Sequence, residues 1–548
     1  MEETKTERPV GSDHGSSDLE SRSEIPTTRF WFLAWSTCLG LLLSFMDSSI
    51  LAASLLNIGD EFKAAGDINW VALSYTLCYL SFAVFVSRLS DIIGRRTAFT
   101  AAYIVFVAFS LACGFAQNMT QLIVCRAFQG IGGSGLYSLT MVILLETAPE
   151  KVKATLGGVI GAVIAAAGVL GPVLGGILTH YASWRWVFWI NGPFGAISLA
   201  LFHFAWPKAE YLPDIEKRTW SELDFLGSGL LIAAAVLVVF PFQNASQEAL
   251  FETAVFLAPL LTGIACWFAL IFWELFLDRH WGDKLAAALP IRLLRNRMFA
   301  AAIANNMLLG FSFVMLLYAF PLRQQVVNDK NSLVAGLMLL PLLGASAIGS
   351  ALAGYINRKK DRICECSILA SSLVALGCGL ETILSDSVEV DVKGLIFLVF
   401  VGLGFGLSAA VTTMAGNLHA SIRDHAPAQG LLAQTRVLGG ALGVAASSAV
   451  LGVTVRSQLT GVVDLNLLNN LESATSTMTD TQLAAVRHAY SDAFSKDMLI
   501  GAIVACAAFI LAFGAWSNPK VRPTVQEHTE RHLEEESERR RIAVGAEV

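Results

Sequence analysis

Long apolar segments separated by short polar joints occupy most of this chain. Fourteen segments are each about 20 residues long, the length that a helix needs to cross roughly 30 Å of hydrocarbon. They are residues 32–55, 69–88, 97–116, 121–145, 154–178, 184–206, 224–242, 252–276, 298–320, 332–354, 364–384, 393–416, 428–454 and 497–517. Because lipid offers no hydrogen-bond partner to an open backbone, such segments must be helices. The pattern therefore predicts an all-α polytopic membrane protein with fourteen transmembrane helices.

Charged residues are scarce, and their positions orient the predicted helices. They make up 15% of the 548 residues, against about 25% in soluble domains. With the N-terminus in the cytoplasm, the predicted cytoplasmic loops hold more than twice as many Lys and Arg residues as the external loops. This bias satisfies the positive-inside rule and places both termini in the cytoplasm. The net charge is −6 and no basic block is present, so no nucleic-acid partner is expected.

The cysteines and histidines do not form the pattern of a metal site or a catalytic centre. The nine cysteines lie mostly in apolar segments, where we expect small buried hydrophobes. Cys364 and Cys366 are close, but a C-x-C pair alone is a weak metal signal. Only His203 falls well inside a predicted helix. We therefore predict no enzymatic activity, no metal and no bound cofactor.

Asp47, Arg126 and Arg436 fall well inside the first, fourth and thirteenth predicted helices. An ionised side chain at a helix centre costs about 2.5–3.5 kcal/mol on insertion scales, so each should face a polar cavity or a charged partner. Gln129 follows Arg126 by nearly one turn and shares its face. Glu146 lies at a helix end, and we expect it to be an interfacial anchor. Asp47 therefore stands out as the acid with a functional role.

The joint between the second and third helices reads SRLSDIIGRRTAF. It places Asp91, Gly94, Arg95 and Arg96 in a short cytoplasmic turn. The arginines anchor the helix ends, and the acid and base together can latch a neighbouring helix end.

Glycines and aromatic residues mark the fifth and sixth helices. In GVLGPVLGG, Gly171, Gly175 and Gly176 allow close packing around Pro172, which removes one backbone hydrogen bond. The sixth helix begins with SWRWVFWINGPFG, whose tryptophans suit a membrane interface.

Together with RAFQGIGGSG and TRVLGGALGVA, these stretches resemble the signatures of the major facilitator superfamily, and in particular its fourteen-helix drug:proton antiporter branch of fungal type. The resemblance implies the major facilitator fold, in which two six-helix bundles are separated by two inserted helices. The implied units are a disordered cytoplasmic tail at 1–30, a bundle at 31–207, a linker with two helices at 208–290, a bundle at 291–517 with an external loop at 455–496, and a cytoplasmic tail at 518–548.

The resemblance implies an exporter of lipophilic drugs, toxins or secondary metabolites that is driven by the proton gradient and works by alternating access. Burial favours a neutral carboxyl and a nearby arginine favours its ionised form, so we predict Asp47 as the proton carrier and Arg126 as its partner. The candidate cavity residues are Tyr75, Gln129, Asn305, Asn306 and Arg436.

Two other functions remain open. A same-fold importer or vacuolar carrier of siderophores or basic amino acids would show extra acids in the cavity. A non-transporting sensor would carry a large cytoplasmic extension, whereas these tails are about 30 residues each.

The two N-x-S/T sequons, at Asn118 and Asn244, fall in predicted external loops and are the candidate glycosylation sites. The expected partners are the lipid bilayer, protons and a small-molecule substrate, and the expected state is a monomer. The expected location is the plasma membrane, with the vacuolar membrane as the alternative.

Overall fold

The computed structural model is built of helices, and no strand occurs in the residues that it describes. The described residues are 25–51, 54–64, 68–208, 219–248, 253–280, 285, 287–289, 291–330, 332–357, 361–420, 425–462 and 478–514. This confirms the predicted all-α fold. The predicted disordered tails lie almost entirely outside the described residues.

Six helical segments form the N-terminal bundle. They are α1 (Thr27–Ile50), α3 (Ile68–Ile93), α4 (Arg95–Gly114), α5 (Met119–Thr147), α6 (Glu150–Tyr181), and α7 (Trp186–Trp189) with α8 (Asn191–Ala205). A further short helix, α2 (Leu55–Phe62), follows α1. The apolar pattern does not separate α2 from the first spanning helix, because its first residues are also apolar.

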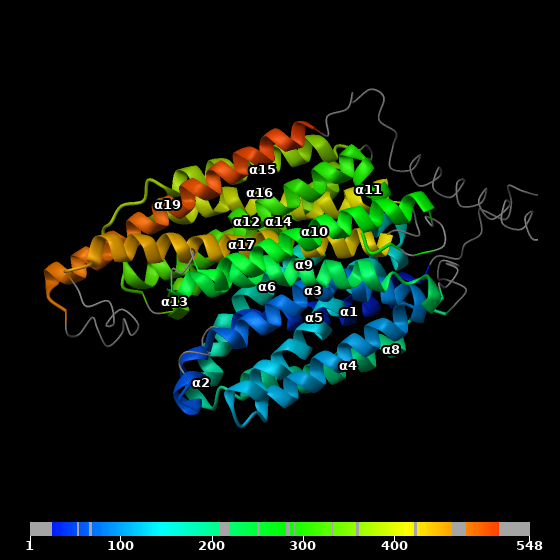
Figure 1. The fold of residues 1–548 in the computed structure, drawn as a ribbon, viewed down its shortest axis with the longest axis horizontal. Coiled ribbons are helices and arrows are strands. Elements are labelled where there is room, and N and C mark those ends of the chain that lie inside the picture. The colour runs from blue at the N-terminus through cyan, green and yellow to red at the C-terminus, as the bar shows by residue number, and fades with distance from the viewer. Residues whose placement is uncertain are drawn as a thin grey trace, which may run out of the picture.

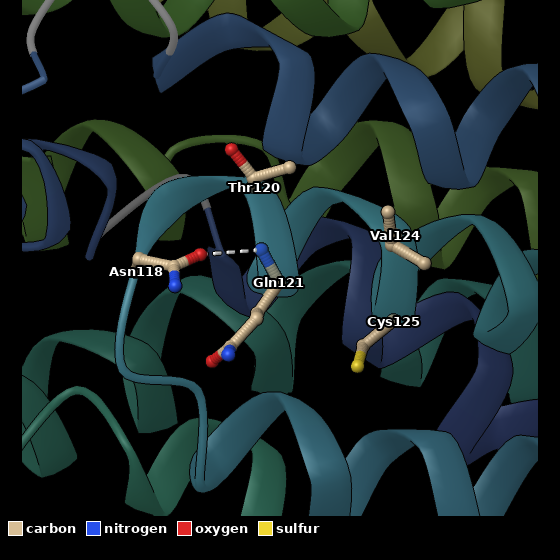
Figure 2. Close-up of a pocket in the computed structure, with 5 residues that line it drawn as sticks. All are labelled: Asn118, Thr120, Gln121, Val124 and Cys125. Atoms are coloured by element: carbon tan, nitrogen blue, oxygen red, sulfur yellow. Dashed lines mark hydrogen bonds between the residues drawn. The ribbon is translucent and has the colours of Figure 1, made fainter.

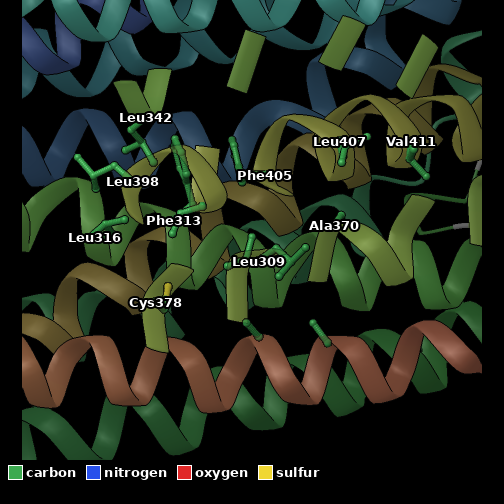
Figure 3. Close-up of a cluster of buried hydrophobic side chains, with 14 of the residues drawn as sticks. Leu309, Phe313, Leu316, Leu342, Ala370, Cys378, Leu398, Phe405, Leu407 and Val411 are labelled. Carbon is green, nitrogen blue, oxygen red and sulfur yellow. The ribbon is translucent and has the colours of Figure 1, made fainter. Parts of the chain in front are cut away.

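Six more segments form the C-terminal bundle, which lies beside the first (Figure 1). They are α12 (Arg297–Val326), α13 (Ser332–Leu337) with α14 (Leu340–Ile356), α15 (Ile363–Glu381), α16 (Val392–His419), α17 (His425–Leu459) and α19 (Asp480–Phe513). Figure 3 shows its apolar core, in which the rings of Phe313 and Phe405 stack with centroids 3.7 Å apart. Cys378 is buried in this core, as expected of a small hydrophobe.

The inserted helices are α9 (Phe225–Glu248) and α10 (Ala254–His280), which stand between the short helices η4 (Trp220–Glu222) and α11 (Ile291–Arg295). α9 packs against α3 of the first bundle and α17 of the second. α10 packs chiefly on α9, and apolar side chains such as Leu261, Phe268 and Phe272 remain exposed. An exposed apolar face of this size suits contact with lipid.

Thirteen helices among the described residues are long and apolar enough to cross a membrane. The chain is therefore a multi-pass membrane protein, as predicted. The predicted segment without a counterpart among these thirteen is the seventh, 224–242, which corresponds to α9; the apolar part of α9, Phe225–Pro241, is only 17 residues long. The count of fourteen stays a prediction.

The predicted external loop at 455–496 is helical over much of its length. α17 continues to Leu459, and α19 begins at Asp480 behind a capping box between Thr479 and Gln482. Val486, Ala489 and their apolar neighbours pack against the ends of α12 and α17. The segment is polar overall, but its apolar residues recur at helical spacing, and it therefore forms a helix rather than a loop. Residues 463–477 of the loop lie outside the described residues.

The bundles meet where α3 packs on α17 and where α6 packs on α14. Small residues bring these helices close together. A Cβ atom at Gly430 would lie 2.9 Å from Ser87 Oγ, and one at Gly161 would lie 2.7 Å from Ser350 Oγ. We refer to these contacts, together with that of α5 on α17, as the bundle interface.

Candidate functional site

Asp47 lies in a buried hydrogen-bond network inside the N-terminal bundle. Its side chain is 0% exposed, and Arg126 Nη1 of α5 donates to Asp47 Oδ2. The other oxygen, Oδ1, accepts from Gln129 Nε2 at 2.9 Å and from Asn191 Nδ2 of α8 at 3.1 Å. Charge-assisted hydrogen bonds to both oxygens offset the cost of burying the pair. The structure thus brings together Asp47, Arg126 and Gln129.

The sequence pattern does not single out Asn191 as a member of this network. Besides Asp47, its Nδ2 group donates to Ser110 Oγ of α4 at 2.9 Å. Ser110 in turn donates to the Phe188 carbonyl oxygen at 2.9 Å. One feature of the sequence could have indicated Asn191: it is an amide residue at the start of an otherwise apolar helix, within SWRWVFWINGPFG. The network therefore joins α1, α4, α5 and α8.

Arg126 also connects the network to α3. Its Nε donates to the Val71 carbonyl oxygen at 3.1 Å, and its guanidinium lies 4.2 Å from the centroid of the Tyr75 ring. Tyr75 was predicted to line the cavity, but it is buried inside the bundle, and its hydroxyl donates to the Ser44 carbonyl oxygen at 2.9 Å. Cation–π contact of this kind is stronger in a desolvated setting. Tyr75 thus positions Arg126.

A row of aromatic rings leads from Tyr75 to the bundle interface. The ring centroids of Tyr75 and Tyr79 are 5.7 Å apart, and those of Tyr79 and Tyr137 are 6.2 Å apart. Phe45 meets the Tyr137 ring edge to face at 5.4 Å. These rings belong to α1, α3 and α5. They form a continuous line of contacts from the Asp47 network toward the second bundle.

Arg436 meets this row from the C-terminal bundle. Its Nη1 donates to the Tyr137 hydroxyl at 3.0 Å, and its Nε donates to Asn306 Oδ1 at 2.9 Å. Its Nη2 lies 3.3 Å from Thr412 Oγ1 and 3.4 Å from the Ala409 carbonyl oxygen. Arg436 therefore stands at the bundle interface, where we predicted the cavity, and Asn306 bonds to it from within the C-terminal bundle.

Asn305 is placed differently, although it is the next residue along α12. Its Nδ2 donates to Ser371 Oγ at 2.7 Å, and its Oδ1 accepts from Ser408 Oγ at 3.1 Å. It also lies 3.3 Å from the Ala508 carbonyl oxygen of α19. All these partners belong to the C-terminal bundle, so the contacts of Asn305 indicate a packing role within that bundle.

The turn between α3 and α4 forms the predicted latch, with Glu146 as its partner on the neighbouring helix. Arg95 Nη1 donates to Asp91 Oδ1 at 2.5 Å, and Arg95 Nη2 donates to Glu146 Oε1 at 3.1 Å. Gly94 separates α3 from α4 with a φ of 87°, a conformation that favours glycine. Arg96 is exposed. The latch thus ties α3, α4 and α5 together.

Two acids on the spanning helices of the C-terminal bundle are buried. Glu381 at the end of α15 is 0% exposed, and Asp497 of α19 is 2% exposed. Asp497 Oδ2 accepts from Ser447 Oγ at 2.5 Å. The sequence placed both acids at the edges of apolar segments, where solvent contact is the usual expectation. In the structure, helices pack against each other beyond the ends of the predicted apolar segments, and this packing buries both acids.

The glycine motif of α6 lies against α1. A Cβ atom at Gly171 would lie 2.7 Å from Ser49 Cβ and 2.9 Å from the backbone nitrogen of Ile50. A Cβ atom at Gly176 would have no neighbour within 4 Å. α6 remains helical through Pro172 and Gly175. The close approach of α6 to α1 therefore requires glycine at position 171 and does not require it at position 176.

Gly171→Leu is therefore expected to destabilise the protein by about 1–3 kcal/mol or more, because the new side chain must push α1 away from α6. Gly176→Leu is the matched control and should stay within about 0.5 kcal/mol of wild type. Thermal unfolding of both purified variants measures the difference. Equal stability of the two variants would contradict the close approach seen at Gly171.

A polar contact joins α2 to the start of α7. Glu61 Oε1 accepts from Arg185 Nη2 at 2.7 Å, and Glu61 Oε2 accepts from Trp184 Nε1 at 2.6 Å. Hydrogen bonds from Arg185, and then from Trp184, lower the pKa of Glu61 from its ordinary value of 4.5. Since the folded-state pKa is the lower one, the contact contributes stability above pH 4.5 and loses it as the pH falls further.

Wild-type protein should thus lose slightly more stability between pH 7 and pH 4 than Glu61→Gln does. The expected difference is at most about 1 kcal/mol, because the Glu61 and Arg185 side chains are partly exposed and solvent screens the pair. Thermal unfolding at the two pH values measures it. A Glu61→Gln variant with the same pH dependence as wild type would contradict this assignment.

The two sequons differ in their local structure. Asn118 caps α5, and its side chain accepts from the Gln121 backbone N–H at 2.8 Å. Figure 2 shows this bond in a shallow hollow of about 450 Å³ lined by Asn118, Thr120, Gln121, Val124 and Cys125. Asn244 was predicted in a loop but lies in the last turns of α9, because the helix continues past Pro241. The hollow does not include Asp47 or Arg436.

Comparison with known proteins identifies the family. Residues 37–444 match the family model described as Major Facilitator Superfamily. The chain belongs to the Major Facilitator Superfamily.

Similar proteins within and beyond fungi agree with this assignment. The chain is 31% identical to the MFS-type transporter FPY5 of Fusarium mangiferae, across 89% of this chain and 84% of that protein. It is 26% identical to the MFS-type efflux pump LUC4 of a Fusarium species, across 93% and 91% of the two chains. The crystal structure of the human organic anion transporter MFSD10 shares the fold, with a TM-score of 0.57, 16% identity, and coverage of 88% of this chain and 100% of that one.

This Major Facilitator Superfamily protein is therefore a membrane transporter and not an enzyme. Its position in the lipid bilayer and a small-molecule substrate follow from the family. The resemblance to the fourteen-helix drug antiporter branch is consistent with the names of its relatives. Among the described residues, no group of three or more His, Cys, Asp or Glu side chains could hold a metal ion.

Proposed function

We propose that the protein exports lipophilic small molecules in exchange for protons by alternating access between its two bundles. The observation that carries this proposal is the buried Asp47–Arg126 pair, which connects through Tyr75, Tyr79 and Tyr137 to the bundle interface. The name of LUC4, an efflux pump, supports the outward direction.

Protonation of Asp47 is the step that would couple the gradient to transport. A neutral carboxyl no longer balances the charge of Arg126, which stays confined by Val71 and Tyr75. An unbalanced charge at a helix centre costs about 2.5–3.5 kcal/mol, which is enough to shift a two-state equilibrium roughly a hundredfold. Because Tyr75 contacts both Arg126 and Tyr79, a shift of the guanidinium would disturb the aromatic row and so the packing of the bundles.

Extra acids in the cavity would indicate an importer. The buried acids Glu381 and Asp497 are not evidence of this kind. Glu381 lies at the end of α15, and Asp497 bonds to Ser447 of α17 within the C-terminal bundle. Among the described residues, neither acid forms a hydrogen bond to the N-terminal bundle. Their positions therefore support export as the single proposed function.

The test uses purified protein in proteoliposomes with an imposed pH gradient and a panel of lipophilic fluorescent compounds. We expect at least one compound to move against the flow of protons, with transport abolished by a protonophore. The same protein expressed in a yeast strain that lacks its own drug exporters should lower retention of that compound. Transport that is unaffected by the protonophore, or higher retention in the expressing strain, would reject the proposal.

A further inference from the structure

Arg126 and Arg436 differ in their charge partners. Arg126 is paired with Asp47, whereas Arg436 donates to neutral acceptors, namely the Asn306 amide, the Tyr137 and Thr412 hydroxyls and the Ala409 carbonyl oxygen. In the part of the chain that the structure describes, no carboxylate forms an ion pair with Arg436. A cation at membrane depth without a counter-charge is costly, so its charge calls for a partner from outside the chain.

Arg436 also stands where a substrate could reach it. Its side chain is only partly buried and extends from α17 to Tyr137 of α5, across the bundle interface. On the α5 side of this contact, the Tyr137 ring meets the buried ring of Tyr79 and the half-buried ring of Phe45. A cation beside aromatic rings suits a ligand that combines a negative group with an aromatic body.

We propose that Arg436 binds the negative group of the substrate, and that the transported compounds are lipophilic aromatic organic anions such as carboxylates. This inference rests on the proposed export function and specifies its substrate class. The guanidinium binds the carboxylate through two parallel N–H donors. The half-buried ring of Phe45 packs on the aromatic body, the buried rings of Tyr79 and Tyr137 support Phe45, and Asn306 holds the guanidinium in place through Nε.

Binding of the anion has a consequence for the bundle interface. Nη1 of Arg436 donates to the Tyr137 hydroxyl at 3.0 Å, and this contact ties α17 to α5. An incoming carboxylate competes for the same N–H group. Occupation of the site therefore releases one contact between the bundles, which links substrate binding to their separation. Tyr137→Phe removes the competing acceptor and should bind the anion at least as tightly as wild type.

The experiment measures binding to purified full-length protein at pH 7 without a gradient, so that failure of proton coupling cannot affect it. The probes are three acid–amide pairs: benzoate and benzamide, 2-naphthoate and 2-naphthamide, and 9-anthroate and its amide. Ligand-induced thermal stabilisation gives the affinities. We expect each acid to bind at least about tenfold more tightly than its amide, because a charge-assisted pair replaces a neutral hydrogen bond. Affinity should rise with ring size.

Variants assign the preference to Arg436. Arg436→Gln should abolish the difference between acid and amide, whereas Arg456→Gln, an exposed arginine on the same helix, should retain it. Equal binding of acids and amides by wild type, including no binding by either, would overturn the proposal. So would a preference for acids that survives in Arg436→Gln. A shift that is produced by anionic phospholipid but not by the acids would assign the site to a lipid headgroup and overturn it as well.

Discussion

Asp47→Asn is expected to abolish proton-driven export while leaving a folded protein. Asparagine matches aspartate in size and keeps one carbonyl oxygen for the donors of Arg126, Gln129 and Asn191. It cannot change its charge, however, and so it holds the network permanently in the neutral state. Export driven by a pH gradient in proteoliposomes should fall to the level of empty vesicles. Exchange of substrate across the membrane without a gradient should continue, because it needs no proton.

Asp497→Asn provides the matched control for this result. Asp497 is also a buried acid, but it bonds to Ser447 inside the C-terminal bundle and not to the Asp47 network. We expect this variant to retain proton-driven export. Full export by Asp47→Asn, or loss of export in Asp497→Asn alone, would remove Asp47 from its proposed role. Size-exclusion chromatography of both variants distinguishes lost coupling from lost folding.

Arg126→Gln is expected to destabilise the protein by about 3–5 kcal/mol, since it leaves the Asp47 carboxylate buried without a counter-charge. The side chains of both residues are almost fully buried, so water cannot replace the lost partner. The double variant Asp47→Asn/Arg126→Gln should recover part of this loss, because it removes both charges together. Unfolding of the four proteins by heat or denaturant completes the double-mutant cycle.

Arg96→Gln serves as the control for charge removal. Arg96 is exposed in the turn between α3 and α4, and its replacement should change the stability by less than about 0.5 kcal/mol. If Arg126→Gln were as stable as wild type, or if the double variant were less stable than both single variants, the pair would not be the charge contact that the structure shows.

Adjacent residues on α12 show how far sequence reasoning could reach. Asn305 and Asn306 stand side by side in an apolar helix, and both were candidates for the cavity. Consecutive residues point about 100° apart on a helix, so only one of them could face the bundle interface. Asn306 bonds to Arg436, whereas Asn305 bonds to Ser371 and Ser408. The helix is apolar on all sides, so no polar face indicates which of the two asparagines contacts Arg436.

Asn191 shows the same limit for the Asp47 network. Arg126 and Gln129 could be connected with each other from their spacing on one helix, and a charge in lipid calls for an opposite charge. Asn191 lies 144 residues from Asp47 along the chain, and its contact depends on how α8 packs on α1. Local sequence carries no information on that packing.

The sequence by itself determined that the chain is a multi-pass membrane protein and which family it belongs to, because lipid enforces apolar segments of one length and the motifs have fixed spacing. It also determined that Asp47, Arg126 and Arg436 must find partners, because an ionised group is costly in a membrane. The sequence also predicted the pairing of Asp47 with Arg126, whereas only the tertiary structure decided the neutral partners, Asn191 for Asp47 and Tyr137 for Arg436. Arg126 lies against Asp47, and Arg436 reaches Tyr137 across the bundle interface, because these contacts arise from the packing of helices far apart in the chain.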